Sequence, residues 1–129
     1  MQANRGKDTA PELAIRSALH KRGLRYRTHV RPLADRRCEA DIVFRNVQVA
    51  IFVDGCWWHG CPEHKQLPKN NRNWWRQKIA ATVDRDRRND EVLESAGWTA
   101  IRVWEHEVPG SAADRIEHVV RKKRAELDQ

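Results

Sequence analysis

The chain of 129 residues has the length of one domain, with 40% hydrophobic and 33% charged residues. No apolar run reaches the roughly 20 residues that a membrane helix needs. The first residues also lack the apolar stretch of a secretory signal. We therefore expect a single cytoplasmic domain spanning residues 1–129, with no membrane segment and no disulfide framework.

The charge balance points to a polyanionic partner. The chain has 25 Lys and Arg against 18 Asp and Glu, a formal net charge of +7. A basic surface gains affinity for nucleic acid because neutralising phosphates releases counterions. Six Trp residues add weight to this prediction, since an indole ring can stack on a base. The three Cys residues favour metal ligation or free thiols over disulfides.

The first quarter of the chain predicts a helix followed by a strand. Thr9 and Glu12 have the spacing of a capping box, and Pro11 is tolerated in a first helical turn. Gly23 supplies the expected end of this helix. The segment 24–30 then alternates polar and apolar residues, which is typical of a strand.

Two further strands are predicted at 40–44 and 47–53. Only Arg45 and Asn46 separate them, so we expect a tight antiparallel hairpin. The second strand becomes continuously apolar at its end, as a strand buried on both faces would. The irregular segment 54–73 follows, and a loop of that length in a compact domain is usually functional.

The last part of the chain predicts a long helix, a strand and a final helix. Asn73 is the expected cap of the long helix, which would end at 95 or 96 before Gly97. A strand at 98–104 and an amphipathic helix from Ser111 complete the order α-β-β-β-α-β-α, a small mixed sheet flanked by helices. The buried line expected for the long helix consists of Trp75, Ile79, Val83, Val92 and Leu93.

The segment after the third strand carries the strongest signal for a metal. Cys56, Cys61 and His64 offer three donors within nine residues, and a tetrahedral zinc site needs a fourth ligand from elsewhere. Cys38 and His106 are the candidates, and we favour His106 because it lies just beyond the last strand. The competing interpretation is a set of free thiols and solvated histidines.

Two carboxylates point to a second metal. Asp41 lies inside an apolar strand, where an ionised carboxylate is costly unless it is paired or bound to a cation. Asp54 ends the adjacent strand. Carboxylates at strand ends in a basic protein suggest a Mg²⁺ site for phosphodiester hydrolysis. The alternative for Asp41 is an ion pair with a neighbouring arginine.

The remaining candidates are a histidine, a helical acid and two aromatic pairs. His59 could act as a general base for an attacking water, or it could replace His64 as a zinc ligand. Glu12 is either a capping residue or a carboxylate close to the sheet. In the pairs Trp57-Trp58 and Trp74-Trp75, adjacent side chains point different ways, so the exposed members are candidates for wedging between bases.

These motifs together resemble the very short patch repair (Vsr) endonucleases. The resemblance rests on RGKDTAPEL, ADIVF, VAIFVDGCWWHGCP, DRDRR and GW-x3-RVWE, which occur in the same order over roughly residues 5 to 108. It implies a restriction-endonuclease-like fold. It further implies a Mg²⁺-dependent nick on the 5′ side of the thymine in a T·G mismatch, such as arises when 5-methylcytosine is deaminated.

The resemblance also assigns roles to residues. Asp41 matches the metal-binding aspartate, and Val53 matches a position that offers its backbone carbonyl to the metal. His59 matches the histidine proposed to activate water, and Glu12 the helical acid near the metal. Asp54 stands where some members have a second active-site histidine and others an aspartate. The structural zinc would be held by Cys56, Cys61, His64 and His106, and the DNA wedge would consist of Trp57, Trp58 and Trp75.

The expected partner is double-stranded DNA with a T·G mismatch, bound by a monomer. The resemblance suggests a cytosine methyltransferase and mismatch-repair proteins as pathway neighbours. Two other functions remain open at this point: a nuclease of the same fold that acts on other DNA without mismatch preference, and a zinc-stapled DNA-binding module without catalysis. Asp41 separates them, because a carboxylate beside a phosphate would weaken a module that only binds DNA.

Overall fold

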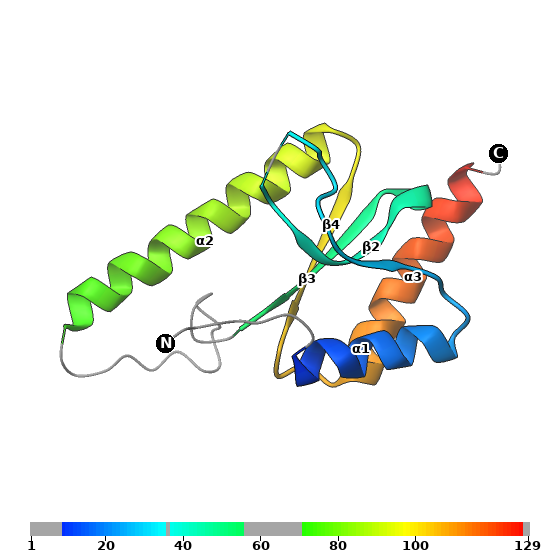
Figure 1. The fold of residues 1–129 in the computed structure, drawn as a ribbon, viewed down its shortest axis with the longest axis horizontal. Helices are drawn as coiled ribbons and strands as arrows, with labels where there is room; N and C mark the ends of the chain where they lie inside the picture. The colour runs from blue at the N-terminus through cyan, green and yellow to red at the C-terminus, as the bar shows by residue number, and fades with distance from the viewer. Residues whose placement is uncertain (1–8, 36, 56–70, 128–129) are drawn as a thin grey trace.

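A computed structural model describes residues 9–35, 37–55 and 71–127. Its elements follow one another in the predicted order α-β-β-β-α-β-α, which confirms that expectation (Figure 1). A single 3₁₀ turn interrupts the hairpin. The elements are α1 (Ala10–Lys21), β1 (Arg27–Val30), β2 (Ala40–Phe44), the 3₁₀ turn (Arg45–Val47), β3 (Val49–Asp54), α2 (Arg72–Ser95), β4 (Thr99–Trp104) and α3 (Pro109–Leu127).

The four strands form one mixed sheet in the order β1-β2-β3-β4. β1, β2 and β3 pair antiparallel, whereas β4 runs parallel to β3. The parallel pair requires a crossover connection, and helix α2 lies within it (Figure 1). The predicted small mixed sheet is therefore confirmed.

Apolar side chains cover both faces of the sheet, so the fold has three layers. The larger core lies between the sheet and the helices α1 and α3. The smaller core lies on the other face, beneath the C-terminal end of α2. The first core includes Ile42, Ile51, Val53 and Val103 from the strands with Ile15, Leu19, Ile116 and Val120 from the helices. The second includes Ala50 and Phe52 with Leu93 and Trp98.

Helix α2 departs most from the sequence prediction. Only Ile79 and Leu93 are buried along it, and Val83 is 40% exposed. The reason is that α2 extends diagonally beyond the sheet, and only its C-terminal part lies over the strands (Figure 1). The periodic apolar residues of the first half therefore have no sheet beneath them. Asn71, and not the predicted Asn73, occupies the N-cap position, and its side chain makes no capping hydrogen bond.

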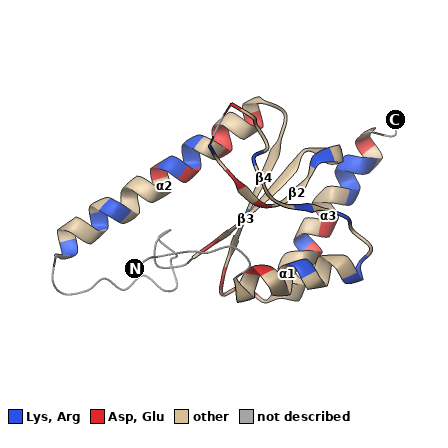
Figure 2. Ribbon diagram, viewed as in Figure 1, with Lys and Arg blue, Asp and Glu red and all other residues tan. Residues whose placement is uncertain are grey.

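Helix α2 carries acidic residues only in its second half, where arginines lie among them. Its first three turns carry only basic charges, from Arg72, Arg76 and Lys78, whereas its acidic residues begin at Asp84. Figure 2 shows the blue N-terminal part of the helix pointing away from the body and the red residues near the sheet. The protruding half of α2 is thus positively charged and tryptophan-bearing. Within the described residues, no helix is long and apolar enough to cross a bilayer.

The β2–β3 connection is longer than predicted. The antiparallel hairpin is confirmed, but Phe44 pairs with Val49, so four residues connect the strands instead of two. Gln48 closes this connection in the left-handed region, with φ 56°. A two-residue turn would have paired Phe44 with Val47, and the longer turn slides β3 by two positions. This slide keeps every side chain on its predicted face, because faces alternate with period two.

Smaller differences concern the ends of elements. The first strand is shorter than the predicted segment 24–30, because Leu24 belongs to the larger core and only 27–30 pairs with β2. Helix α3 begins at Pro109, two residues before the predicted Ser111. The two glycines predicted to end helices are confirmed. Gly23 has φ 77° after α1 and Gly97 has φ 90° after α2, and glycine adopts positive φ without a Cβ clash.

Candidate active site

Asp41 is fixed at the end of the β2–β3 hairpin by the main chain of the neighbouring strand. The backbone N–H of Val53 donates a hydrogen bond of 2.7 Å to Asp41 Oδ2. The slide of the hairpin register makes this contact possible, since it brings Asp41 opposite Phe52 in the β2–β3 ladder. An accepted N–H bond favours the ionised form of a carboxylate. This hydrogen bond thus holds the Asp41 carboxylate in place beside β3.

Glu12 lies beside His29 and Asp41 and is not part of a helix cap. Thr9 occupies the N-cap position of α1, but its side chain makes no capping hydrogen bond, so the predicted capping box is wrong. Glu12 instead turns inward and is only 2% exposed. Its Oε2 atom lies 3.2 Å from Arg16 Nη1 and 3.1 Å from His29 Nε2. A buried carboxylate is costly when it is unpaired, so contacts with Arg16 and His29 stabilise Glu12 more than a capping bond would.

His29 was not singled out by the sequence and is the third residue here. It lies in β1, where the register places it opposite Asp41, between the pairs Thr28–Ile42 and Val30–Ala40. Its φ is 53°, which is unusual for a residue with a side chain. An alternating strand sequence gives no signal for this conformation.

Glu12, His29 and Asp41 together form a compact set of metal-ligating groups. One ligand atom from each lies within 4.8 Å of the others. Adjacent ligands of a six-coordinate Mg²⁺ lie about 3 Å apart, because each stands about 2.1 Å from the ion. The Glu12–His29 distance of 3.1 Å matches that spacing. The donor set, two carboxylates and one imidazole, therefore fits a divalent cation.

The protonation of Glu12 reflects this crowding. Burial raises the pKa of the Glu12 carboxyl above its ordinary value, and the negative charge of Asp41 raises it further. His29 and Arg16 oppose the shift but do not cancel it. Two carboxylates sharing a buried space repel each other, and a cation between them would remove that repulsion.

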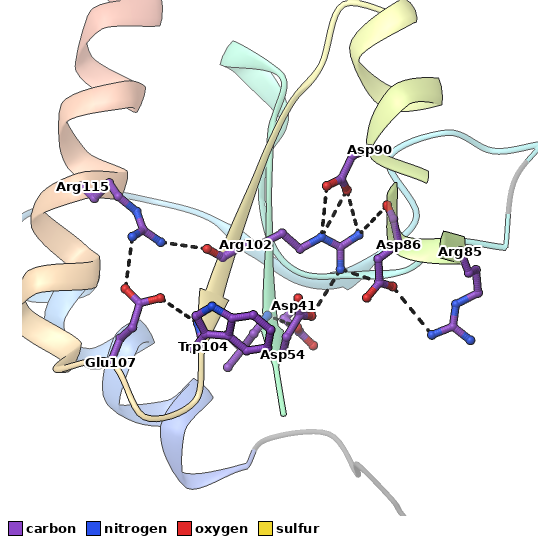
Figure 3. A network of polar contacts seen from close by, with 10 residues as sticks. Asp41, Asp54, Arg85, Asp86, Asp90, Arg102, Trp104, Glu107 and Arg115 are labelled. Atoms are coloured by element: carbon purple, nitrogen blue, oxygen red, sulfur yellow. Dashed lines mark hydrogen bonds and ion pairs between the residues drawn. The ribbon is translucent and has the colours of Figure 1, made fainter. Parts of the chain in front are cut away.

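Asp54 is buried and belongs to a different network. It ends β3, as predicted, but its Oδ1 atom lies 3.2 Å from Arg102 Nη1 (Figure 3). Arg102 comes from β4, and its guanidinium also contacts Asp86 and Asp90 on α2. Among the described residues, Asp54 is therefore not part of the Glu12–His29–Asp41 cluster.

Arg102 binds three carboxylates and one aromatic ring at once. Its Nε and Nη2 atoms lie 3.1 and 2.8 Å from Asp90 Oδ1, and its Cζ atom lies 4.0 Å from the centre of the Phe52 ring. Burial lowers the pKa of the guanidinium, but the bond to Asp90 and the charges of Asp54 and Asp86 outweigh it, so the pKa is raised. Figure 3 shows this residue joining the end of β3 to α2.

Several predicted site residues lie outside the described part of the chain. These are His59 and the wedge residues Trp57 and Trp58, together with the zinc ligands Cys56, Cys61 and His64. The fourth zinc ligand, His106, is described and is exposed in the turn that follows β4. Cys38, which the prediction left out of the zinc site, packs half-buried against the smaller core.

The third predicted wedge residue lies on the protruding half of α2. Trp75 is half-buried, and its ring meets that of Trp74 edge to face at a centroid distance of 4.5 Å. Trp74 is 49% exposed, and Lys78 Nζ lies 5.3 Å above its ring. The structure thus combines two indoles and a cation on one exposed segment.

Comparisons with known proteins show which proteins this chain is similar to. A family model described as DNA mismatch endonuclease Vsr matches residues 1–65. The type II nicking enzyme V.NaeI of Lentzea aerocolonigenes is 49% identical over 109 residues, covering 83% of this chain and 66% of that protein. V.XorIIP of Xanthomonas oryzae pv. oryzae, also a type II nicking enzyme, is 39% identical over 124 residues, covering 93% and 88%.

Two further similarities complete the comparison. The DNA mismatch endonuclease Vsr of Escherichia coli K12 is 36% identical over 107 residues, covering 81% of this chain and 66% of that protein. The catalytic domain of a homing endonuclease superimposes with a TM-score of 0.49 and 18% identity, covering 93% and 92% of the two chains.

The family model and the nicking-enzyme and mismatch-endonuclease relatives define the class of the protein as a DNA endonuclease. More particularly, the chain belongs to the Vsr family, as its resemblance to that family predicts.

Proposed function

We propose that this protein is a Mg²⁺-dependent endonuclease of restriction-endonuclease-like fold that nicks DNA on the 5′ side of the thymine in a T·G mismatch. The observation that carries the proposal is the cluster of Glu12, His29 and Asp41, with Asp41 fixed by the Val53 amide. A protein that only bound DNA would gain nothing from two carboxylates, one buried and one half-buried, where a phosphate must approach. The E. coli relative is named as a mismatch endonuclease.

Asp41, Glu12 and the backbone carbonyl of Val53 are the proposed holders of the cation. When bound, Mg²⁺ supplies charge neutralisation at the scissile phosphate and stabilises the leaving oxygen. The chain's own part is to aim Asp41 through the main-chain bond of 2.7 Å and to keep Glu12 within reach from α1. His59 would accept the proton of the attacking water.

Asp54 is proposed to act from beside this cluster. Asp54 is 6% exposed, and its carboxylate is paired with the guanidinium of Arg102. A paired carboxylate of this kind can orient a neighbouring histidine or water without binding the metal. We propose this orienting role for Asp54 and leave the metal to Asp41 and Glu12.

The basic first half of α2 is the proposed DNA-binding element. Arg72, Arg76 and Lys78 are exposed there and can neutralise phosphates, while Trp75 can wedge beside the mismatch together with Trp57 and Trp58. A T·G step costs less to open than a Watson–Crick step, so a wedge favours the mismatch. One copy of the chain would bind one duplex.

A structural zinc ion is proposed for the segment that carries His59. Its ligands would be Cys56, Cys61, His64 and His106, which are the donor types of a closed tetrahedral site. His106 lies directly after β4, and the Glu105 N–H that precedes it donates to the carbonyl of Asp54, 3.0 Å away. A zinc ion at His106 would thus tie the segment to the end of β4, beside Asp54.

The experiment uses labelled duplexes that carry T·G, C·G or T·A at one position, with purified protein and Mg²⁺. We expect a nick in the T·G duplex alone, on the strand with the thymine, and no cleavage by Asp41→Ala. Asp35→Asn, which changes an exposed turn carboxylate, is the matched control and should cleave normally. Equal cutting of all three duplexes would refute mismatch specificity, and tight binding without any cutting would refute the enzyme.

A further inference from the structure

His29 has a backbone conformation that the rest of β1 does not explain. It faces Asp41 across the β1–β2 register, yet its φ of 53° lies in the left-handed region. Residues with a Cβ adopt this region at an energetic cost, which persists only where surrounding contacts impose it. Strand pairing on both sides of His29, at Thr28 and Val30, is regular. The distortion is therefore confined to one residue.

The side chain of His29 is directed into the carboxylate cluster. Its Nε2 atom lies 3.1 Å from Glu12 Oε2, and one of its ring nitrogens lies within 4.8 Å of an Asp41 oxygen. Glu39 approaches the other ring nitrogen, Nδ1, at 4.0 Å. The side chain is 12% exposed, so the imidazole is nearly enclosed. A metal-ligating histidine usually donates its second ring N–H to a carboxylate. Glu39 is the carboxylate on that side of His29, at an ion-pair distance and beyond hydrogen-bond distance.

We propose that His29 is a third side-chain ligand of the divalent cation, beside Glu12 and Asp41. This inference rests on the proposed function, because it concerns the same cation. It changes the chemistry of the site from an all-oxygen set to a mixed nitrogen and oxygen set. An imidazole ligand favours transition-metal ions over Mg²⁺ and Ca²⁺, which prefer oxygen.

The test is pulsed EPR of the zinc-loaded protein with Mn²⁺ and without DNA. A directly coordinated imidazole gives ¹⁴N modulation of the Mn²⁺ signal, which we expect in the wild-type protein. His29→Asn should abolish it, and this variant is chosen because asparagine tolerates a positive φ and so preserves the fold. His29→Gln is the second variant, and circular dichroism checks that both are folded.

Two controls separate His29 from the other histidines. His20→Gln changes an exposed histidine on α1, the helix of Glu12, and should keep the ¹⁴N modulation. His59→Gln should keep it as well. Modulation that persists in both His29 variants, or that disappears with His59→Gln alone, would overturn the proposal. Absence of modulation in the wild-type protein with Mn²⁺ bound would overturn it too.

Metal affinity provides an independent measurement. We expect His29→Asn to weaken Mn²⁺ binding by about tenfold or more and Mg²⁺ binding by less, so that the Mn²⁺ preference falls. An equal loss for the two ions would mean that His29 only positions Glu12, and the ligand role would be refuted. These measurements need no cleavage. A protein that binds Mn²⁺ through His29 but never nicks DNA would refute the proposed function alone, and nicking without ¹⁴N modulation would refute this inference alone.

Discussion

Arg102 and Asp90 join strand β4 to helix α2 through two hydrogen bonds, from Nε at 3.1 Å and from Nη2 at 2.8 Å to the same Oδ1 atom. The opposite side of the guanidinium, through Nη1, holds Asp54 at the end of β3. One side chain therefore contacts both helix α2 and the buried carboxylate of Asp54. Arg102 therefore couples the position of the basic, tryptophan-bearing part of α2 to the geometry beside the candidate site.

Arg102→Met should destabilise the protein. The substitution leaves Asp54 buried without its guanidinium partner, and a lost charged hydrogen bond of this kind costs about 2 kcal/mol or more. Urea unfolding monitored by tryptophan fluorescence measures the change. Arg87→Met removes an exposed pair with Asp84 on the same helix and should change the free energy of unfolding by less than about 1 kcal/mol. Equal effects of the two substitutions would contradict the account given for Arg102.

Glu12→Gln should stabilise the metal-free protein at neutral pH. The pKa of Glu12 is raised in the folded state above its ordinary value of 4.5, so the folded protein binds this proton more tightly than the unfolded chain. Stability is then lost as the pH rises from 4.5 through the folded pKa, and the glutamine variant avoids that loss. Thermal unfolding in EDTA at several pH values measures the difference, which should vanish below 4.5.

Added Mg²⁺ should reverse this order. A cation that binds only the folded protein stabilises it by mass action, and the wild-type carboxylate binds the cation better than the amide does. At millimolar Mg²⁺ the melting temperature of the wild type should therefore rise more than that of Glu12→Gln. An identical rise in both proteins would exclude Glu12 from the cation site.

Substitutions on the first half of α2 should separate affinity from discrimination. Lys78→Gln should weaken binding to T·G and C·G duplexes alike and lower the salt dependence by about one phosphate contact. Trp75→Ala should reduce the preference for T·G, since it removes a proposed wedge, at a cost of about 1–3 kcal/mol in mismatch binding. Fluorescence anisotropy at several salt concentrations measures both effects. Lys122→Gln, on α3, is the matched control and should leave both quantities unchanged.

Removing zinc should abolish DNA cleavage, because the segment that carries His59 would lose the metal ion that is proposed to hold it. We expect about one zinc ion per chain by elemental analysis, lost in His106→Ala and retained in Cys38→Ser, because Cys38 packs against the smaller core. Cys38→Ser should also nick T·G duplexes normally. Zinc that is retained in His106→Ala but lost in Cys38→Ser would reassign the fourth ligand.

Local patterns predicted the parts of this fold that local interactions determine. The apolar run at 40–44 became β2 with unchanged bounds, and Gly23 and Gly97 end their helices. The turn after β2 was predicted two residues too short, because its length depends on Gln48 adopting a left-handed conformation. That error also misplaced Asp41, since the true register is what places Asp41 beside the Val53 amide.

The site was predicted where chemistry is visible in the sequence and missed where it depends on tertiary contacts. A carboxylate inside an apolar strand made Asp41 conspicuous. Glu12 fits a capping motif equally well, and only its burial against His29 resolves the two interpretations. His29 has no local signal at all, because its role depends on a distorted backbone torsion and on a helix that packs against the strand from elsewhere in the chain.

The bond from the Val53 amide to Asp41 is made by the main chain, and this has a consequence for how the enzyme can vary. Every residue except proline offers the same N–H at position 53. The orientation of the Asp41 carboxylate is therefore set by the backbone of the hairpin and tolerates almost any change of side chain at position 53. Sequence drift at that position can alter packing and specificity while leaving the orientation of the carboxylate intact.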